Sequence, residues 1–300
     1  MKPNLVEDLN KICDIQCDVP LSSMTTLKIG GLAKYVAYPD TDIALDSLIR
    51  FCKEKELSYK VIGKGSNLLC SDDVYEGVVI RLDRYFTDII FHGTTVTVQA
   101  GLSIIALATL AAKKGLSGLE FACGIPATVG GTLFMNAGAY KSCMADVVKE
   151  VFVYHDGKAE WIPNEACQFS YRHSIFQTNR DWIILAARLE LVEKDSEEIF
   201  TLMENRRTRR IASQPLNYPS CGSVFRNPDG MNAWELIEGI GYRGHRLGGA
   251  EVSNKHCNFI VNVDHATANE YLALVHEVQQ KVYDKYGVTL ITEMEKFNWK

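Results

Sequence analysis

The feature of this sequence that most constrains its fold is a glycine-rich stretch near the middle, Gly124–Tyr140, which runs GIPATVGGTLFMNAGAY. Two of its glycines, Gly130 and Gly131, are adjacent. Glycine has no Cβ, so these positions suit a backbone that turns sharply or lies against a flat or phosphorylated ligand. A buried turn between a strand and a helix is the alternative interpretation. The length of the stretch and the presence of Asn136 favour a ligand-binding loop.

Length and composition indicate a folded protein without an unusual partner. The chain has 300 residues, enough for one large domain or two ordinary ones. Its hydrophobic fraction of 47% and charged fraction of 23% are typical of globular proteins rather than of disordered chains. The formal net charge of -5 gives no reason to expect nucleic acid or an anionic membrane as a partner.

Cysteine usage and the N-terminus predict a cytoplasmic protein. The nine cysteines contain no CxxC pair, and Cys13 with Cys17 lacks the second pair that a zinc site needs. We therefore expect reduced, mostly buried thiols and no bound metal. The N-terminus carries Glu7 and Asp8 and lacks the apolar core of a signal peptide. No apolar run reaches the roughly 18 residues that could span a bilayer.

A second glycine loop lies at residues 63–68, between two β-prone runs. It does not match the dinucleotide fingerprint, because Leu68 occupies the place of the last glycine and no helical pattern follows. A Walker loop is excluded because GKGS lacks the required spacing. The backbone N–H groups of this loop, with Ser66 and Asn67 beside them, are suited to a pyrophosphate.

Hydrophobic periodicity, caps and turn residues place the regular elements. An amphipathic helix is expected within residues 1–20, ending near Asp18. Further helices are expected to begin near Thr41, Ser103, Asp195 and Thr267, with strands over 36–38, 94–100, 182–192 and 288–297, and a hairpin over 147–162 around Asp156-Gly157.

Three other segments each allow two interpretations. Arg172, among the apolar residues of FSYRHSIFQ, is either packed along its stem or held in a site by hydrogen bonds. The arginines of 206–210 are either a solvated helix end or contacts to a diphosphate. Ser223, in CGSVFRNP, is by its neighbours an ordinary turn residue, because no GxSxG elbow surrounds it.

Several of these motifs together resemble one family. GIPATVGG followed by MNAGAY, G-x-GSNLL, YRHS and GS-x-F-x-NP are similar to motifs of the bacterial UDP-N-acetylenolpyruvoylglucosamine reductases, the MurB family of peptidoglycan synthesis. The length between Tyr140 and Arg172 resembles the shorter type, which lacks a loop with an additional substrate-contacting tyrosine. The sequence departs from the family at Ala127, commonly glycine, and at 141–143, where a glycine-rich continuation is usual.

The resemblance implies an α+β fold with a particular domain order. An N-terminal helical segment, 1–26, would precede an FAD-binding domain of the PCMH (vanillyl-alcohol-oxidase-like) type in two subdomains, 27–193. A C-terminal α+β substrate-binding domain would occupy 194–300.

It also implies FAD as the cofactor, NADPH as the reductant and a set of site residues. The residues that would contact FAD are Gly63, Lys64, Gly65, Ser66, Asn67, Leu68, Gly124, Ile125, Ala127, Thr128, Gly130, Gly131, Asn136, Ala137 and Gly138. The substrate contacts would be Tyr171, Arg172, Arg226 and Asn227. The catalytic residues would be Ser223 as proton donor, Arg172 at the enolpyruvyl group and Glu293, which matches the terminal motif by position where Glu295 does not.

The implied function is the NADPH-dependent reduction of a UDP-sugar enolpyruvate to UDP-N-acetylmuramate by a monomeric cytoplasmic enzyme. Hydride would come from FAD N5, because no amino acid side chain donates hydride. Two alternatives stay open: another FAD oxidoreductase with the same type of cofactor domain, and a catalytically silent protein that binds FAD or a UDP-sugar.

Overall fold

Buried hydrophobic residues fall into two separate cores, and each core belongs to its own unit of the chain. The computed structural model describes residues 5–299. The first unit contains 35–64, 77–209 and the described part of 1–16, and the second contains 17–34, 65–76 and the described part of 210–300. The domain boundaries expected near residues 27 and 194 stay a prediction.

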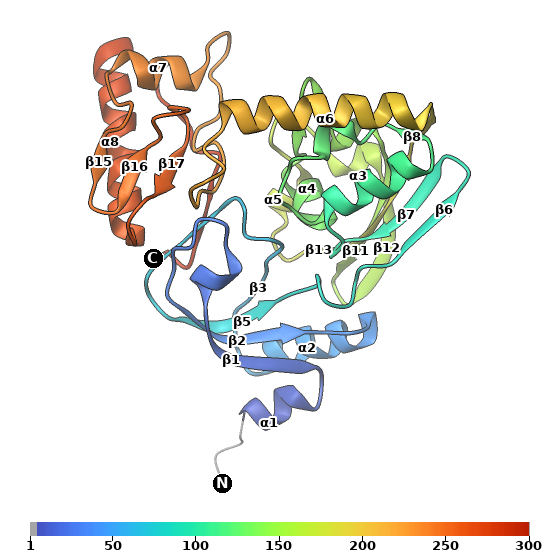
Figure 1. Ribbon diagram of the computed structural model, residues 1–300. Helices are drawn as coiled ribbons and strands as arrows, with labels where there is room; N and C mark the ends of the chain where they lie inside the picture. Colours follow the sequence, from blue (N-terminus) through green and yellow to red (C-terminus); the bar gives the residue numbers. More distant parts are fainter. Residues whose placement is uncertain (1–4, 300) are drawn as a thin grey trace. The chain divides into compact units, whose positions relative to one another are not determined.

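The elements of the described residues are as follows (Figure 1). The helices are α1 (Leu5–Asn10), α2 (Asp42–Glu54), α3 (Ile104–Lys113), α4 (Val129–Phe134), α5 (Ile175–Thr178), α6 (Ser196–Ser213), α7 (Ala233–Gly239) and α8 (Ala268–Tyr286). Short 3-10 helices are η1 (Leu21–Met24), η2 (Glu120–Ala122), η3 (Met144–Asp146) and η4 (Asn164–Cys167). The strands are β1 (Asp14–Pro20), β2 (Leu32–Tyr38), β3 (Tyr59–Val61), β4 (Leu68–Cys70), β5 (Tyr75–Ile80), β6 (Ile89–His92), β7 (Thr95–Gln99), β8 (Leu116–Ser117), β9 (Gly138–Ala139), β10 (Ser142–Cys143), β11 (Val148–His155), β12 (Lys158–Pro163), β13 (Ile183–Glu190), β14 (Val192–Glu193), β15 (Arg246–Leu247), β16 (Ala250–Val252), β17 (Ile260–Asn262) and β18 (Glu295–Phe297).

The N-terminal segment corrects a prediction. The helix expected to run to about Asp18 ends at Asn10, and strand β1 follows; the first four residues of the expected helix lie outside the described residues. Strand β1 pairs at the edge of a sheet with the order β1-β2-β5-β3. Within it Ile15 and Val19 are half-buried while their neighbours are exposed. Pairing with a neighbouring strand therefore decides the conformation of this segment, which local periodicity does not report.

An antiparallel sheet with the order β12-β11-β13-β7-β6 lies at the centre of the first unit. Its strands β7 and β13 confirm the strands expected over 94–100 and 182–192. Helices α3 and α4 lie beside it in Figure 1, and α4 contacts both β7 and β13. Val98, Leu107, Leu133 and Ala187 from these elements are buried together in the first core.

The hairpin β11–β12 has the expected turn. Asp156 and Gly157 have positive φ values of 49° and 77°, the left-handed conformation that a two-residue hairpin turn requires. Pairing runs from His155–Lys158 at the turn to Glu150–Pro163. The hairpin expected around Asp156-Gly157 is therefore confirmed.

Helix α8 organises the second unit. It begins with the expected capping box: the Glu270 backbone N–H donates to Thr267 Oγ1 at 3.1 Å, and the Thr267 N–H donates to Glu270 Oε2 at 2.9 Å. It ends at Gly287, whose φ of 69° provides the left-handed C-cap. Its buried face packs with Val252 of β16 and Ile260 of β17. That face consists of Tyr271, Leu274, Val275, Val278 and Val282.

The end of the chain corrects a second prediction. A strand was expected over 288–297, but only Glu295–Phe297 forms one, pairing in parallel with β4. Upstream of it, Thr292 makes an isolated antiparallel bridge with Phe225. The segment changes partner between Thr292 and Glu295, so it cannot continue as a single strand.

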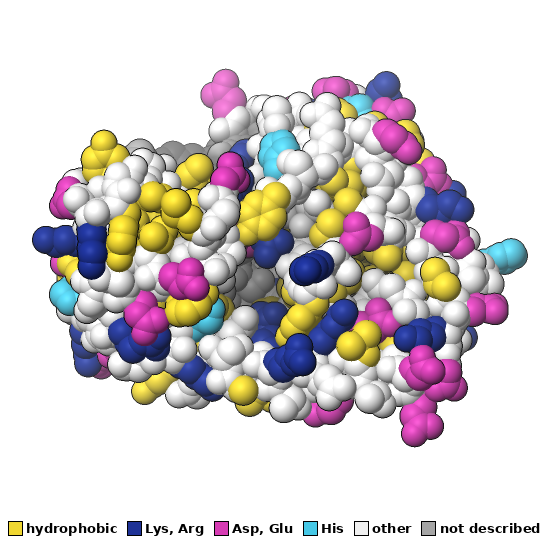
Figure 2. Space-filling model, turned by 90° about the horizontal axis from the view of Figure 1, so that it is seen from above, with side chains coloured by type: hydrophobic (Ala, Val, Ile, Leu, Met, Phe, Trp, Pro, Cys, Tyr) yellow, Lys and Arg dark blue, Asp and Glu magenta, His cyan; other side chains and the backbone are white. Residues whose placement is uncertain are grey.

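The described residues can be compared with the expectations about cysteines, membrane spans, metal sites and charge. All nine cysteines lie within them and none forms a disulfide there, and five are buried: Cys52, Cys70, Cys167, Cys221 and Cys257. Across residues 5–299, no helix is both long and apolar enough to cross a membrane. Over the same residues, no group of three or more His, Cys, Asp and Glu side chains could hold a metal ion. Acidic and basic side chains both occur across the face drawn in Figure 2.

Replacing Thr267 by alanine removes the capping oxygen from the helix that carries the second core. We expect Thr267→Ala to lower the free energy of unfolding by about 1 kcal/mol, measured by urea denaturation. The control is Thr201→Ala, at an exposed position inside α6, which should change it little. Equal stability of the two variants would mean that the capping box contributes nothing.

Candidate functional site

Gly63, at the start of the first glycine loop, lies against the second loop within the first unit. A methyl group on Gly63 would lie 2.6 Å from Thr128 Oγ1, so the absence of a side chain at Gly63 permits the contact between the loops. Thr128 is the N-cap of α4, and its Oγ1 accepts a hydrogen bond from the Gly131 N–H at 3.2 Å. The stretch expected to be a loop therefore turns into a helix at Val129.

Gly130 and Gly131 lack side chains for different reasons. A Cβ on Gly130 would lie 3.0 Å from the Cβ of Ala100, and the Gly130 N–H donates to the Ala100 carbonyl at 2.8 Å. Packing of α4 on the end of β7 thus explains Gly130. At Gly131 the nearest atom to a Cβ would be Thr128 Oγ1 at 3.4 Å, an ordinary contact. The protein itself does not require glycine at 131, and an approaching ligand would explain it.

The remaining loop residues are held by backbone hydrogen bonds. The Ala127 carbonyl accepts from the Ile104 N–H at 3.1 Å, and the Ala127 N–H donates to the Ile125 carbonyl at 2.8 Å. The Ala137 N–H donates to the Thr132 carbonyl at 2.8 Å. Gly124, Ile125, Ala127, Ala137 and Gly138 are half-buried, so each keeps part of its surface open to a ligand.

Lys64, expected to contact the cofactor, already has an acidic neighbour. Its Nζ lies 3.7 Å from Asp83 Oδ2, and Asp83 is also bound by Arg81. Burial raises the pKa of Asp83, but the hydrogen bond to Arg81 and the charges of Arg81 and Lys64 outweigh burial and leave the pKa below its ordinary value. The carboxylate therefore stays charged and partly neutralises Lys64.

Asn136 joins the second loop to the segment that carries Arg172. Its Nδ2 donates to the Ser170 carbonyl at 2.9 Å, and its Oδ1 accepts from the Ala145 N–H at 3.0 Å. Asn136 is buried and has a left-handed φ of 41°. Its side chain thus spans two backbone segments, a supporting role that the sequence pattern did not indicate.

Arg172 is held on the same loop. Its Nη2 donates to the Gly138 carbonyl at 3.0 Å, which favours the interpretation that hydrogen bonds hold Arg172 in a site. The residue has a φ of 55°, a conformation that residues with a side chain seldom adopt. Gln177 supports it, because its Nε2 donates to the Arg172 carbonyl at 3.0 Å and to the Phe134 carbonyl at 3.0 Å. Sequence reasoning missed Gln177; an amide in an apolar run was its only signal.

Tyr171 and two arginines of the 206–210 group contact side chains near them. The Tyr171 ring is 56% exposed, and the Arg172 guanidinium lies 5.1 Å from its centroid. Arg206 lies 4.9 Å from the ring centroid of Tyr140, whose hydroxyl donates to the Arg206 carbonyl at 2.8 Å. Arg207 lies 3.9 Å from Glu204. Contacts of the 206–210 arginines with a diphosphate stay a prediction.

In the second unit, the segments that carry Ser223 and Glu293 lie side by side. The Glu293 N–H donates to the Val224 carbonyl at 2.7 Å, and the Arg226 N–H donates to the Ile291 carbonyl at 2.9 Å. Both Ser223 and Glu293 are half-buried. The structure therefore brings two of the three expected catalytic residues onto paired backbones, although 70 positions separate them in the sequence.

Asn258, which sequence reasoning also missed, fixes the segment after Ser223. Its Oδ1 accepts from the Phe225 N–H at 3.0 Å, and its Nδ2 donates to the Phe225 carbonyl at 2.8 Å. Its own carbonyl accepts from the Val224 N–H at 2.9 Å. Asn258 is 4% exposed, so these bonds form away from water, where an unmade bond would be costly.

The other predicted residues of the second unit are Asn227, near the start of α7, and residues 65–68 of the first glycine loop. Asn227 Oδ1 accepts from the Ala233 N–H at 3.0 Å, so Asn227 caps the start of α7. A methyl group on Gly65 would lie 2.4 Å from the Met24 carbonyl, so packing already requires glycine there. Ser66, Asn67 and Leu68 are half-buried, and Leu68 begins the ladder with β18.

Two titratable side chains of the second unit, Cys221 and His256, favour their neutral forms. Burial raises the pKa of the Cys221 thiol to about 11, and this thiol lies 3.2 Å from the Tyr271 hydroxyl. Burial lowers the pKa of His256, which favours a neutral imidazole. Thiolate chemistry is therefore excluded at Cys221.

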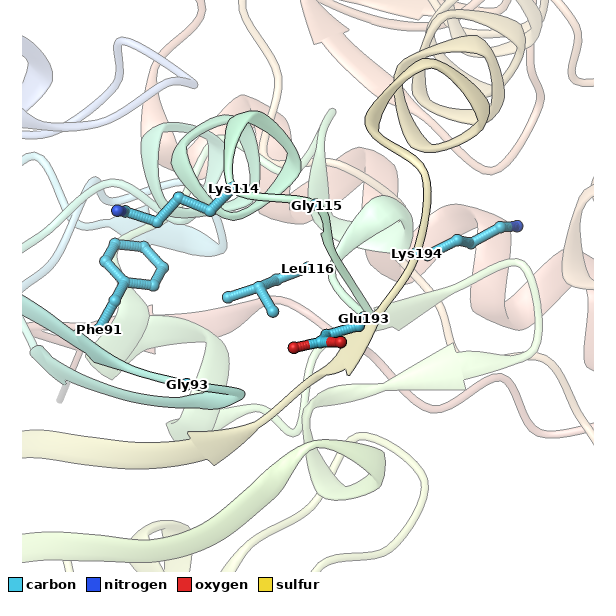
Figure 3. A pocket seen from close by; sticks show the side chains of 7 residues that line it. All are labelled: Phe91, Gly93, Lys114, Gly115, Leu116, Glu193 and Lys194. Atoms are coloured by element: carbon cyan, nitrogen blue, oxygen red, sulfur yellow. The ribbon is translucent and has the colours of Figure 1, made fainter.

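One open depression, of about 710 Å³, lies away from these residues in the first unit (Figure 3). Lys114 Nζ lies 5.0 Å from the centroid of the Phe91 ring, and Lys194 points away toward Glu198, 3.2 Å distant. It contains none of the predicted site residues. Its lining is Phe91, Gly93, Lys114, Gly115, Leu116, Glu193 and Lys194.

Family models match both parts of the chain. Residues 33–162 match the FAD binding domain family, and residues 214–297 match the C-terminal domain of UDP-N-acetylenolpyruvoylglucosamine reductase. Together with the paired glycine loops, the matches define a flavin-dependent oxidoreductase. They confirm the expected α+β fold class with an FAD-binding domain.

The relatives identify the family. The UDP-N-acetylenolpyruvoylglucosamine reductase of Anoxybacillus flavithermus is 46% identical over 276 residues, 92% of this chain and 91% of that protein. The Bacillus subtilis enzyme of the same name is 42% identical over 277 residues, 92% of this chain and 91% of that protein. The chain belongs to the UDP-N-acetylenolpyruvoylglucosamine reductase family, as the motifs indicated.

A solved structure of the same family has the same fold. The crystal structure of UDP-N-acetylenolpyruvylglucosamine reductase (MurB) from Thermus caldophilus superimposes with a TM-score of 0.82 at 36% sequence identity. The match covers 95% of this chain and 98% of that one.

Gly131 allows a test of whether the second loop holds the flavin. Gly131→Ala should leave the stability of flavin-free protein unchanged or raise it by up to about 1 kcal/mol, because alanine is the better helix former and meets no close atom. FAD affinity should fall by about tenfold or more, since the added methyl group would occupy ligand space. Thermal unfolding and fluorescence titration with FAD measure the two effects.

Gly130→Ala is the matched control, because its methyl group would press on Ala100 and lower stability without any ligand. If Gly131→Ala binds FAD as tightly as the unchanged protein, Gly131 does not belong to the cofactor site.

Proposed function

We propose that this protein reduces UDP-N-acetylglucosamine enolpyruvate to UDP-N-acetylmuramate for peptidoglycan synthesis, with FAD as cofactor and NADPH as reductant. The observation that carries the proposal is the pairing of the Ser223 and Glu293 segments, within the region that matches the reductase C-terminal domain. Reduction of the enolpyruvyl double bond requires a hydride at the terminal carbon and a proton at the carbon that bears the ether oxygen and carboxylate.

The residues of both glycine loops fit the cofactor. Gly131 leaves a space that a side chain would fill, and Gly63 lets the loops approach each other. The loops would hold FAD through the backbone N–H groups and small side chains of 63–68, 124–131 and 136–138. Bound FAD supplies the hydride that the protein's side chains cannot.

Arg172 would stabilise the negative charge that develops on the substrate carboxylate. Its guanidinium is anchored by the Gly138 carbonyl, and its backbone is held by Gln177. A donor that is already in place does not have to reorganise when charge appears, and such donors stabilise transition states by about 3 to 4 kcal/mol in comparable sites. Tyr171, Arg226 and Asn227 would contact the rest of the substrate.

Ser223 would donate the proton, and Glu293, in its protonated form, would donate a hydrogen bond to the developing enolate. A serine hydroxyl is a weak acid, so its donation requires a strongly basic carbon in a site that excludes water. The hydrogen bond between Val224 and Glu293 keeps the segments that carry the two residues adjacent.

The substrate is a small UDP-sugar rather than a macromolecule. We further propose a monomer in the cytoplasm that engages neither nucleic acid nor membrane, since its net charge is -5. Its product serves cell-wall biogenesis, and through it cell shape and division.

The reaction has two halves, reduction of the flavin by NADPH and its reoxidation by the substrate. Removing the Ser223 hydroxyl should affect only the second. Ser223→Ala should keep the rate of flavin reduction by NADPH and lower the rate of flavin reoxidation by the enolpyruvyl substrate by about 100-fold or more, the contribution of a positioned general acid. Anaerobic stopped-flow absorbance at the flavin band measures both rates.

Ser220→Ala, three positions upstream, is the control and should keep both rates. Equal losses of both half-reactions in Ser223→Ala would assign Ser223 a structural role. Absence of flavin from the unchanged protein would contradict the proposed function itself.

A further inference from the structure

Asn67 connects the first glycine loop to Glu293. Its Nδ2 donates to the Glu293 carbonyl at 2.9 Å, although 226 positions separate the two residues. Its own carbonyl accepts from the Glu295 N–H at 2.8 Å. Both bonds lie within the second unit.

The side-chain bond occurs where the strand ladder is missing. The pairing of β4 with β18 begins at Leu68 and Glu295. Glu293 precedes β18 and lies outside the paired residues of this ladder. The side chain of Asn67 makes a hydrogen bond where a ladder hydrogen bond would otherwise lie. It thereby links the segment before β18 to the segment before β4.

With this bond, both backbone polar groups of Glu293 are fixed. Its N–H donates to the Val224 carbonyl at 2.7 Å, on the Ser223 segment, and its carbonyl accepts from Asn67. The peptide groups on either side of the Glu293 Cα cannot rotate without breaking one of these bonds. The direction of the Cα–Cβ bond, and hence the starting point of the carboxyl group, is thereby set.

We propose that Asn67 is a positioning residue that orients Glu293. Through it, the conformation of the glycine loop at 63–68 affects the reduction of the enolpyruvyl substrate. The inference rests on the proposed function of Glu293. Asparagine is suited to this task, because its amide has N–H donors, and one of them makes the bond to the Glu293 carbonyl.

The test compares Asn67→Ala with Asn298→Ala in the flavin-loaded enzyme. Asn298 makes the same kind of bond between the same two stretches of chain, donating to Ser71 Oγ at 3.2 Å and to the Asp73 carbonyl at 3.2 Å, but at the far end of the ladder. Both variants lose amide–backbone bonds, so both should lose stability. Only Asn67→Ala should disturb Glu293.

We expect Asn67→Ala to slow flavin reoxidation by the enolpyruvyl substrate about tenfold, the effect of one lost hydrogen bond that holds a reacting group. The rate of flavin reduction by NADPH should stay within about twofold, and FAD affinity, measured by fluorescence titration, should fall by less than about tenfold. Asn298→Ala should keep both rates.

A double-mutant cycle with Glu293→Gln shows whether Asn67 acts through the carboxyl group. In the Glu293→Gln background, Asn67→Ala should slow the substrate step by less than about twofold, because no carboxyl group remains to be misplaced. The pH dependence of the substrate step should also change in Asn67→Ala and not in Asn298→Ala.

Additive losses in the cycle, or an effect of Asn67→Ala confined to FAD affinity, would overturn the inference while Glu293 keeps its role. An unchanged substrate step in Glu293→Gln would instead contradict the proposed function of Glu293, so the two failures are distinguishable.

Discussion

The second unit depends on one backbone pairing, between the segment after Ser223 and the segment that leads to Glu293. The bridge between Phe225 and Thr292 and the bonds around it bring together residues that lie far apart in the sequence of the unit. Loop-closure entropy opposes such a contact, so the buried face of α8 and the amide of Asn258 must offset it. The segments that carry Ser223 and Glu293, the proposed reacting residues, are thus positioned by packing elsewhere in the unit.

Glycine has two different roles in the loops of this protein. At Gly65 and Gly130 a Cβ would lie 2.4 Å and 3.0 Å from its nearest neighbour, so packing within the protein disfavours a side chain. At Gly131 the nearest atom to a Cβ would be 3.4 Å away, an ordinary contact, so packing does not require glycine there and the proposed cofactor would explain it. A glycine-rich sequence motif does not distinguish these cases, because the same residue removes a side chain for either purpose. The distances to neighbouring atoms distinguish them.

Sequence predicted the parts of the fold that local physical chemistry decides. The capping box at Thr267 and the turn at Asp156 were predicted because residues close in the chain determine them. Strand β1 and the shortened β18 were not, because each owes its conformation to a distant partner. The site residues came from the family resemblance, while Asn258 and Gln177 were missed, since side-chain bonds to backbone leave no periodic pattern.

Amide side chains recur wherever a candidate reacting residue lies outside regular structure. Gln177 holds the backbone of Arg172, and Asn67 holds that of Glu293. Neither Arg172, with its left-handed φ of 55°, nor Glu293 belongs to a strand or helix that would fix its peptide groups. A side-chain amide can rotate to meet a carbonyl that lies outside a ladder, without the register that a ladder imposes. Loops that carry chemistry can therefore be held as firmly as strands while their side chains stay directed at a ligand.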